Sequence, residues 1–231
     1  MNDVRHVFLD LDRTLWDFEK NSTAELLALF SKYKLNEKGI SLSNEFIKVY
    51  KNINDKCWAL YRENKLSKED LRGIRFLKTL EYFGVSDQQL ADDIGLDYIT
   101  NSPVRTLLLD GCIELLDYLR SKYELHIITN GFEEVQHKKL LNSHLAVYFK
   151  EVITSEAAGY KKPNPQIFNY AINKTGALIT ESVMIGDDLN TDIQGAINVN
   201  MNAIYFNPNR KKHDFNLLGD VSHLLEIKSI L

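Results

Sequence analysis

Five short apolar runs recur along the chain in a pattern that is typical of buried parallel strands. Each run is too short for a helix, and most lack the alternation of a strand with one face in water. Helical patterns such as 113–122 and 133–142 separate the later runs. Strands that alternate with helices predict an α/β fold with a doubly wound parallel sheet. We expect the strands at 4–10, 125–129, 151–155, 183–187 and 203–207.

The stretch 17–99 breaks this rhythm, because it contains several helical patterns and no convincing strand. Ser67 and Ser86 each begin a pattern that is typical of a helix start. We therefore expect a helical domain at 17–99, inserted into an α/β core made of 1–16 and 100–231. One apolar stripe in the insert steps by four and three residues, as on one face of a helix: Phe46, Tyr50, Ile53, Cys57 and Leu60.

Composition and charge argue against several classes of protein. The 231 residues are 44% hydrophobic and 26% charged, which suits a globular chain that needs no disulfide or metal staple. The formal net charge of -4 argues against nucleic acid as a partner, since binding a phosphate backbone usually needs a basic face. No apolar stretch approaches the about 20 residues that span a bilayer, and the N-terminus lacks the apolar segment of a signal peptide. We expect a cytoplasmic monomer or homodimer that binds neither membrane nor nucleic acid.

Carboxylates follow two of the predicted strands, although burying unpaired charge is costly. Ligands of open parallel sheets bind at the carboxyl ends of strands, so these acids are expected at one site. They would repel one another unless a cation joined them, and an all-oxygen site suits Mg²⁺. Solvated strand ends are the alternative, as are acids that complement a helix dipole. The residues are Asp10 and Asp12, Asp187 and Asp188, and then Asp192 on the next helix.

Thr129 and Lys162 add two further signals. Thr129 ends a predicted strand and offers a hydroxyl where a phosphoryl oxygen could bind. Lys162 precedes Pro163, which favours an extended backbone and so helps to aim the lysine. Its ammonium could neutralise both the acids and a transferring phosphoryl group. Each signal alone is weak, since Thr-Asn-Gly is a common turn and most lysines are solvated.

Together, these signals resemble the haloacid dehalogenase (HAD) superfamily. Its four motifs are an Asp-x-Asp strand end, a Ser/Thr strand end, a lysine, and a late Gly-Asp acid pair. All four occur in this order between Asp10 and Asp192, so the resemblance covers nearly the whole chain. It implies a Rossmann-like core, and the insert looks like the α-helical cap of subfamily I.

The resemblance also implies a reaction, the hydrolysis of a phosphomonoester through an aspartyl-phosphate. Asp10 would be the nucleophile, and Asp12 would be the general acid and then the general base. Thr129 and Lys162 would bind the phosphoryl oxygens.

Mg²⁺ is the cofactor that the resemblance implies. Its protein ligands would be Asp10, the backbone carbonyl of Asp12, and Asp187. Asp188 or Asp192 would act through water or by holding the lysine.

The dehalogenases of the superfamily lack the second aspartate of the first motif, because a halide needs no acid to leave. The presence of Asp12 therefore favours a phosphate ester over a halide as the substrate. Sugar-phosphate phosphatases and phosphomutases share the motifs and stay open, whereas a non-enzymatic binding module requires that the metal site does not form.

A finer resemblance is to the bacterial house-cleaning pyrimidine 5′-nucleotidases, which implies a small phosphorylated metabolite, a nucleoside monophosphate, as the substrate. It is carried by 128–132 with Gln136, by Ser155-Glu156 before Gly159, and by 58–61. For Trp58 the alternative is a place in the core of the helical insert. The candidate substrate contacts are Asn130 and Gly131 beside a strand end, and Trp16, Trp58 and Phe132, which could stack on a base.

Overall fold

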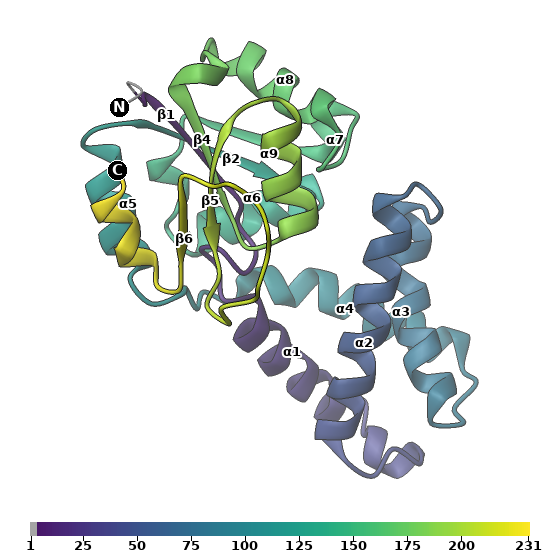
Figure 1. Cartoon of the computed structure of the whole chain (residues 1–231). Helices are drawn as coiled ribbons and strands as arrows, with labels where there is room; N and C mark the ends of the chain where they lie inside the picture. Colours follow the sequence, from purple (N-terminus) through teal and green to yellow (C-terminus); the bar gives the residue numbers. More distant parts are fainter. Residues whose placement is uncertain (1–3) are drawn as a thin grey trace. The chain divides into compact units, whose positions relative to one another are not determined.

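The computed structural model of the chain describes residues 4–231 and divides into two compact units (Figure 1). One unit comprises the chain up to Phe18 together with Thr106–Leu231, and the other is Glu19–Arg105. Residues 100–105, which we predicted in the core, belong instead to the helical unit, and residues 17–18, which we predicted in the insert, belong to the core unit. In the helical unit the last helix runs to Asn101, and a short turn that contains Pro103 follows it.

A six-stranded parallel sheet with the order β3-β2-β1-β4-β5-β6 forms the centre of the first unit. Five of the strands occupy the five apolar runs, so the predicted doubly wound fold is confirmed. The sixth strand was not predicted, because it has three residues, of which only Val221 is apolar and buried. The strands are β1 His6–Leu9, β2 Glu124–Thr129, β3 Glu151–Thr154, β4 Ser182–Gly186, β5 Asn202–Phe206 and β6 Gly219–Val221.

Helices cover both faces of this sheet (Figure 1). Neighbouring strand residues point to opposite faces, so Phe8 and Leu9 belong to two different hydrophobic clusters. Leu9 packs in the cluster that includes Leu115 of α5, and Phe8 in the cluster that includes Phe168 of α8. Burial on both faces explains why the strands have continuous apolar runs. The helices are α5 Cys112–Arg120, α6 Glu133–Asn142, α7 Ser155–Ala158, α8 Pro165–Thr175 and α9 Gln194–Asn198.

The second unit is built from helices. As predicted, Ser67 caps one of them by accepting a hydrogen bond from the backbone N–H of Asp70, but the next helix is capped by Asp87 rather than Ser86. No helix within residues 4–231 is long and apolar enough to cross a membrane. The helices are α1 Phe18–Lys32, α2 Ser43–Arg62, α3 Lys68–Tyr82 and α4 Gln88–Asn101.

The apolar stripe of α2 packs as expected over most of its length. Phe46 and Tyr50 lie in the core of the helical unit, and Cys57 is buried. At the end of α2 the stripe shifts by one residue, because Tyr61 is buried and Leu60 is exposed.

Short single turns complete the two units. They are η1 Leu35–Lys38, η2 Ser102–Val104, η3 Ala146–Tyr148, η4 Ile179–Glu181 and η6 Leu224–Ser229, all of the 3₁₀ type, and η5 Leu189–Ile193, a π-helical turn directly after β4.

Candidate functional site

The ends of three adjacent strands position the first residues of the site. β1 lies between β2 and β4, and the chain order reverses direction across the sheet at β1 and β4. Such a switch point is where open parallel sheets bind ligands. Asp10 follows β1, Thr129 ends β2, and Asp187 follows β4, so the strand order brings together residues that are far apart in the sequence.

Lys162 is buried at this edge of the sheet, and its ammonium group contacts three oxygen atoms. Its Nζ lies 2.6 Å from Oδ1 of Asp10, 2.6 Å from Oδ1 of Asp192 and 2.6 Å from the carbonyl oxygen of Ile128. Burial lowers the pKa of Lys162, but the attraction of the two carboxylates outweighs burial and raises the pKa above its ordinary value. The lysine is therefore charged at neutral pH, and Asp192 holds it in place.

Three acids cluster beside this lysine, of which Asp10 and Asp192 are buried and Asp187 is partly buried. Asp10, Asp187 and Asp192 each offer a carboxylate oxygen, and these oxygens lie within 4.8 Å of one another. Burial raises the pKa of Asp10 to about 7, although the attraction of Lys162 opposes the shift. Burial, with repulsion from Asp10 and Asp192, raises the pKa of Asp187 well above its usual range.

When all three acids are ionised, they carry more negative charge than one lysine can neutralise. A divalent cation would relieve their repulsion, and a set of carboxylate oxygens is the ligand chemistry that Mg²⁺ prefers. The residues present therefore fit Mg²⁺. Asp192 belongs to this cluster and also forms an ion pair with Lys162, one of the two roles expected for it.

The carboxylate of Asp12 is held by α6. Nζ of Lys139 donates to its two oxygens at 2.6 and 2.8 Å, and Nε2 of Gln136 donates at 2.9 Å. Lys139 is buried, and its ammonium lies 4.3 Å from the ring centre of Trp16. Lys139 was not among the residues predicted for the site. The available signal was its spacing of three residues from Gln136, which puts both side chains on one face of the helix.

Gln136 also connects Asp12 to Thr129. Its Nε2 donates to Oγ1 of Thr129 at 2.9 Å, and the backbone N–H of Gly131 donates to the same oxygen at 3.0 Å. A Cβ at Gly131 would lie 1.8 Å from Nε2 of Gln136, so a larger residue there would displace the Gln136 side chain from this position. These contacts fix the position of the Thr129 hydroxyl.

Asn130 and Asp188 make contacts within the protein. The side chain of Asn130 donates to the backbone carbonyl of Lys162 at 3.0 Å and accepts from its backbone N–H at 2.7 Å. Asn130 therefore holds the segment that carries the lysine. Asp188 accepts hydrogen bonds from two backbone N–H groups that begin η5, which is the helix-capping alternative.

The three aromatic candidates for base stacking differ in exposure. Trp16 is fully buried and packs in the hydrophobic cluster beside α5, so it offers no stacking surface, contrary to the prediction. Phe132 is 4% exposed, and the same correction applies to it. Trp58 lies in the helical unit, is partly exposed, and meets the ring of Tyr61 edge-on at 5.4 Å. Of the three, Trp58 retains surface for a ligand.

Known proteins are similar to this chain over nearly its whole length. The family described as haloacid dehalogenase-like hydrolase matches residues 4–200. HAD-hydrolase YfnB of Bacillus subtilis is 28% identical over 99% of this chain and 98% of its own length. Pyrimidine 5′-nucleotidase YjjG of Escherichia coli is 28% identical over 97% and 96%. Glyceraldehyde 3-phosphate phosphatase of Methanothermobacter thermautotrophicus is 32% identical over 97% and 99%.

Solved structures share the architecture. The structure of YfnB bound to magnesium matches with a TM-score of 0.88 at 27% identity, and covers 98% of both chains. L-2-haloacid dehalogenase of Xanthobacter autotrophicus matches with a TM-score of 0.76 at 15% identity, over 98% of both chains. At that identity the second match concerns the fold alone.

Proposed function

This chain belongs to the haloacid dehalogenase-like hydrolases, and we propose that it is a Mg²⁺-dependent phosphomonoester hydrolase that acts through a covalent intermediate on Asp10. The observation that carries the proposal is the position of Asp10 at the end of β1. Its Oδ1 lies 2.6 Å from the buried ammonium of Lys162, which orients the carboxylate. A buried carboxylate with a fixed orientation is suited to nucleophilic attack.

The reaction has two steps. A carboxylate oxygen of Asp10 attacks phosphorus, the bond to the leaving oxygen breaks, and Asp12 gives that oxygen a proton. Asp12 then takes a proton from water, whose oxygen attacks the aspartyl-phosphate and releases phosphate. Thr129 and Lys162 stabilise charge on the phosphoryl oxygens in both steps.

The acid cluster would hold the cation through Asp10 and Asp187, with the backbone carbonyl of Asp12 as a third ligand. A bound Mg²⁺ supplies positive charge that favours the ionised form of Asp10 and offsets the charge of the phosphoryl oxygens. Asp192 keeps Lys162 at the nucleophile by its 2.6 Å ion pair.

The position of Asp12 favours phosphate esters over haloacids. A halide needs no proton when it leaves, whereas an alkoxide does. Two buried residues of α6, Gln136 and Lys139, hold the Asp12 carboxylate, and this support is expected where the acid takes part in the reaction.

A pyrimidine nucleoside 5′-monophosphate is the proposed substrate. The similarity to the pyrimidine 5′-nucleotidase YjjG supports it. A small sugar phosphate is the second candidate, because glyceraldehyde 3-phosphate phosphatase is 32% identical over nearly the whole chain.

A panel of phosphate esters assayed with Mg²⁺ tests both the proposed reaction and the proposed substrate. We expect hydrolysis of p-nitrophenyl phosphate, and higher kcat/KM for UMP, dUMP or dTMP than for sugar phosphates. No hydrolysis of any ester would overturn the phosphatase assignment. Sugar phosphates that are better by about tenfold would overturn the pyrimidine assignment alone.

Trp58→Ala tests whether this ring contacts the base. Base stacking on one ring is worth on the order of 1 kcal/mol, so we expect KM for nucleotides to rise several-fold while hydrolysis of p-nitrophenyl phosphate stays nearly unchanged. Leu60→Ala at another exposed position of α2 is the matched control. If both substrates are affected equally, Trp58 contributes only to packing of the helical unit.

A further inference from the structure

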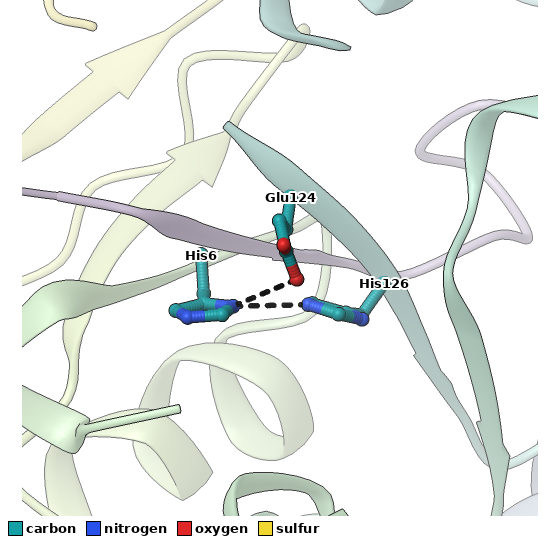
Figure 2. Close-up of side chains that lie close together, drawn as sticks. All are labelled: His6, Glu124 and His126. Atoms are coloured by element: carbon teal, nitrogen blue, oxygen red, sulfur yellow. Dashed lines mark hydrogen bonds and ion pairs between the residues drawn. The ribbon is translucent and has the colours of Figure 1, made fainter. Parts of the chain in front are cut away.

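A second group of potential metal ligands lies at the amino ends of β1 and β2 (Figure 2). β1 begins at His6, β2 begins at Glu124, and these two residues are register partners in the parallel pair. His126 follows two residues after Glu124, and residues two apart in a strand face the same side of a sheet. The pairing of two strands therefore places two imidazoles and one carboxylate together on one face.

The ligand atoms of this group converge. Nδ1 of His6 lies 3.2 Å from Nε2 of His126 and 3.9 Å from Oε2 of Glu124. Two ligands of a tetrahedral zinc ion, each at about 2.0–2.1 Å, lie about 3.3–3.5 Å apart. The observed spacings lie on either side of this value, so side-chain shifts of a few tenths of an ångström would admit an ion.

The ring of His126 is held with Nε2 towards His6. It is buried and stacks against both His6 and Phe8, with ring centres 5.5 and 4.9 Å apart. Its Nδ1 is buried and has no hydrogen-bond partner among residues 4–231, so Nε2 makes the polar contact of the ring.

We propose that His6, Glu124 and His126 form a binding site for a divalent transition-metal ion, with zinc as the preferred ion. Two imidazole nitrogens and one carboxylate oxygen match the ligands of zinc sites with three protein ligands, and imidazole selects against Mg²⁺. The side chain of Glu124 is 54% exposed, so an ion can enter from solvent and water can occupy the fourth position. This site is separate from the acid cluster, which offers oxygen ligands only.

Zinc titration of the full chain in excess Mg²⁺ tests the proposal, because Mg²⁺ fills the acid cluster first. Calorimetry should show one zinc ion bound per chain. Cobalt in place of zinc should give the intense visible absorption of a four-coordinate ion rather than the weak absorption of a six-coordinate one.

Three variants locate the bound ion. Glu124→Gln, at an exposed position, should weaken zinc binding at least about tenfold, and His6→Asn should weaken it further. His144→Asn is the matched control. It removes an exposed histidine whose φ of 57° is a conformation that asparagine tolerates, and it should bind zinc as the wild type does.

The proposal fails if the wild type shows no saturable zinc binding under these conditions. It also fails if Glu124→Gln and His6→Asn bind zinc as tightly as the wild type, or if Asp187→Asn abolishes zinc binding while they do not. Thermal unfolding without metal checks that each variant is folded. Because Glu124 is exposed, its variant keeps the test decisive even if His6→Asn is unstable.

Discussion

β1 carries a different kind of site at each of its ends. At the carboxyl end, Asp10 lies among other acids with one charged lysine, and every candidate ligand atom is oxygen. At the amino end, His6 lies beside a second imidazole and a half-exposed carboxylate. The first group draws on loops that follow several strands, and Lys162 comes from 152 residues away in the chain. The second needs only the register of β1 and β2.

This contrast shows how position in a parallel sheet affects the chemistry of a site. Loops that meet at a switch point can bring many charged groups together, and these groups stabilise one another although each is costly to bury alone. At the amino end the buried His126 is neutral, and the charged group stays in water. Changes of charge should therefore affect catalysis strongly at the carboxyl end and hardly at all at the amino end.

The largest expected effect separates the two ends directly. Asp10→Asn should reduce phosphatase activity to below a few per cent of the wild type, because an amide is a poor nucleophile. His6→Asn, at the other end of the same strand, should keep activity within about twofold, since it touches no reacting group. Steady-state assays of both variants, with circular dichroism to check the fold, make the measurement. Substantial turnover by Asp10→Asn would exclude the covalent mechanism.

Removal of the metal should have the next largest effect. EDTA should abolish activity, and added Mg²⁺ should restore it. Mg²⁺ should also raise Tm in the wild type by relieving repulsion among the acids, and should raise it less in Asp187→Asn. Glu124→Gln should respond to Mg²⁺ as the wild type does. Full turnover in chelator would contradict the dependence on Mg²⁺. A loss of the Mg²⁺ response in Glu124→Gln would contradict the prediction that Mg²⁺ acts at the carboxyl end of β1 alone.

Asp12→Asn should slow turnover by about 10². The loss should be larger for substrates with a poor leaving group than for p-nitrophenyl phosphate, because nitrophenolate leaves without a proton. A comparison of kcat/KM for the two substrates measures this difference, because kcat/KM reports the first step and not the later hydrolysis, in which Asp12 acts as base for both substrates. Equal losses for both would mean that Asp12 does not act as a general acid.

A smaller effect is expected from the lysine that holds Asp12. Lys139→Met keeps an unbranched side chain of similar length but removes the ammonium, which lies over the Trp16 ring and makes two charge-assisted hydrogen bonds worth about 1.5–3 kcal/mol each. Only part of this lost free energy should raise the barrier of the reaction. We therefore expect kcat to fall about tenfold with little change in KM.

Lys138→Met, on the exposed neighbouring position of α6, is the control and should behave as the wild type. Partial recovery in Lys139→Arg, together with a changed pH profile in Lys139→Met, would support a positioning role. If Lys138→Met and Lys139→Met have equal effects, the contact between Lys139 and Asp12 does not matter for the reaction.

A further effect concerns the pH dependence of stability in chelator. The pKa of Asp10 is about 7 in the folded chain and 3.8 ordinarily, so the native state binds the extra proton between these values. Its contribution to stability is therefore present at low pH and lost as pH rises from about 4 to about 7. His126 at the other end has the opposite sign, because its pKa is lowered from 6.5 to about 4 and its contribution is lost as pH falls.

Asp10→Asn removes the first of these titrations and leaves the second. The Tm of Asp10→Asn should therefore rise relative to that of the wild type as pH increases from about 4 to about 7. Thermal unfolding of both proteins across this range makes the measurement. A Tm difference that does not change with pH would mean that Asp10 titrates near its ordinary value.

The sequence by itself determined the parallel sheet and the strand ends that carry Asp10, Thr129 and Asp187. Both are local signals, since a continuous apolar run reports burial and an acid that ends such a run conflicts with burial. The strand β6 gave too little signal, because it is short and mostly polar and is defined by its pairing with β5.

Only the tertiary structure decided which side chains meet. The contact of Lys139 with Asp12, the burial of Trp16 and the approach of His6 to His126 join residues that no local pattern connects. Each depends on which strands are neighbours and on which face of a helix is turned towards the sheet. Those are global properties of packing, whereas periodicity in the sequence reports only whether a position is buried, and not against which partner.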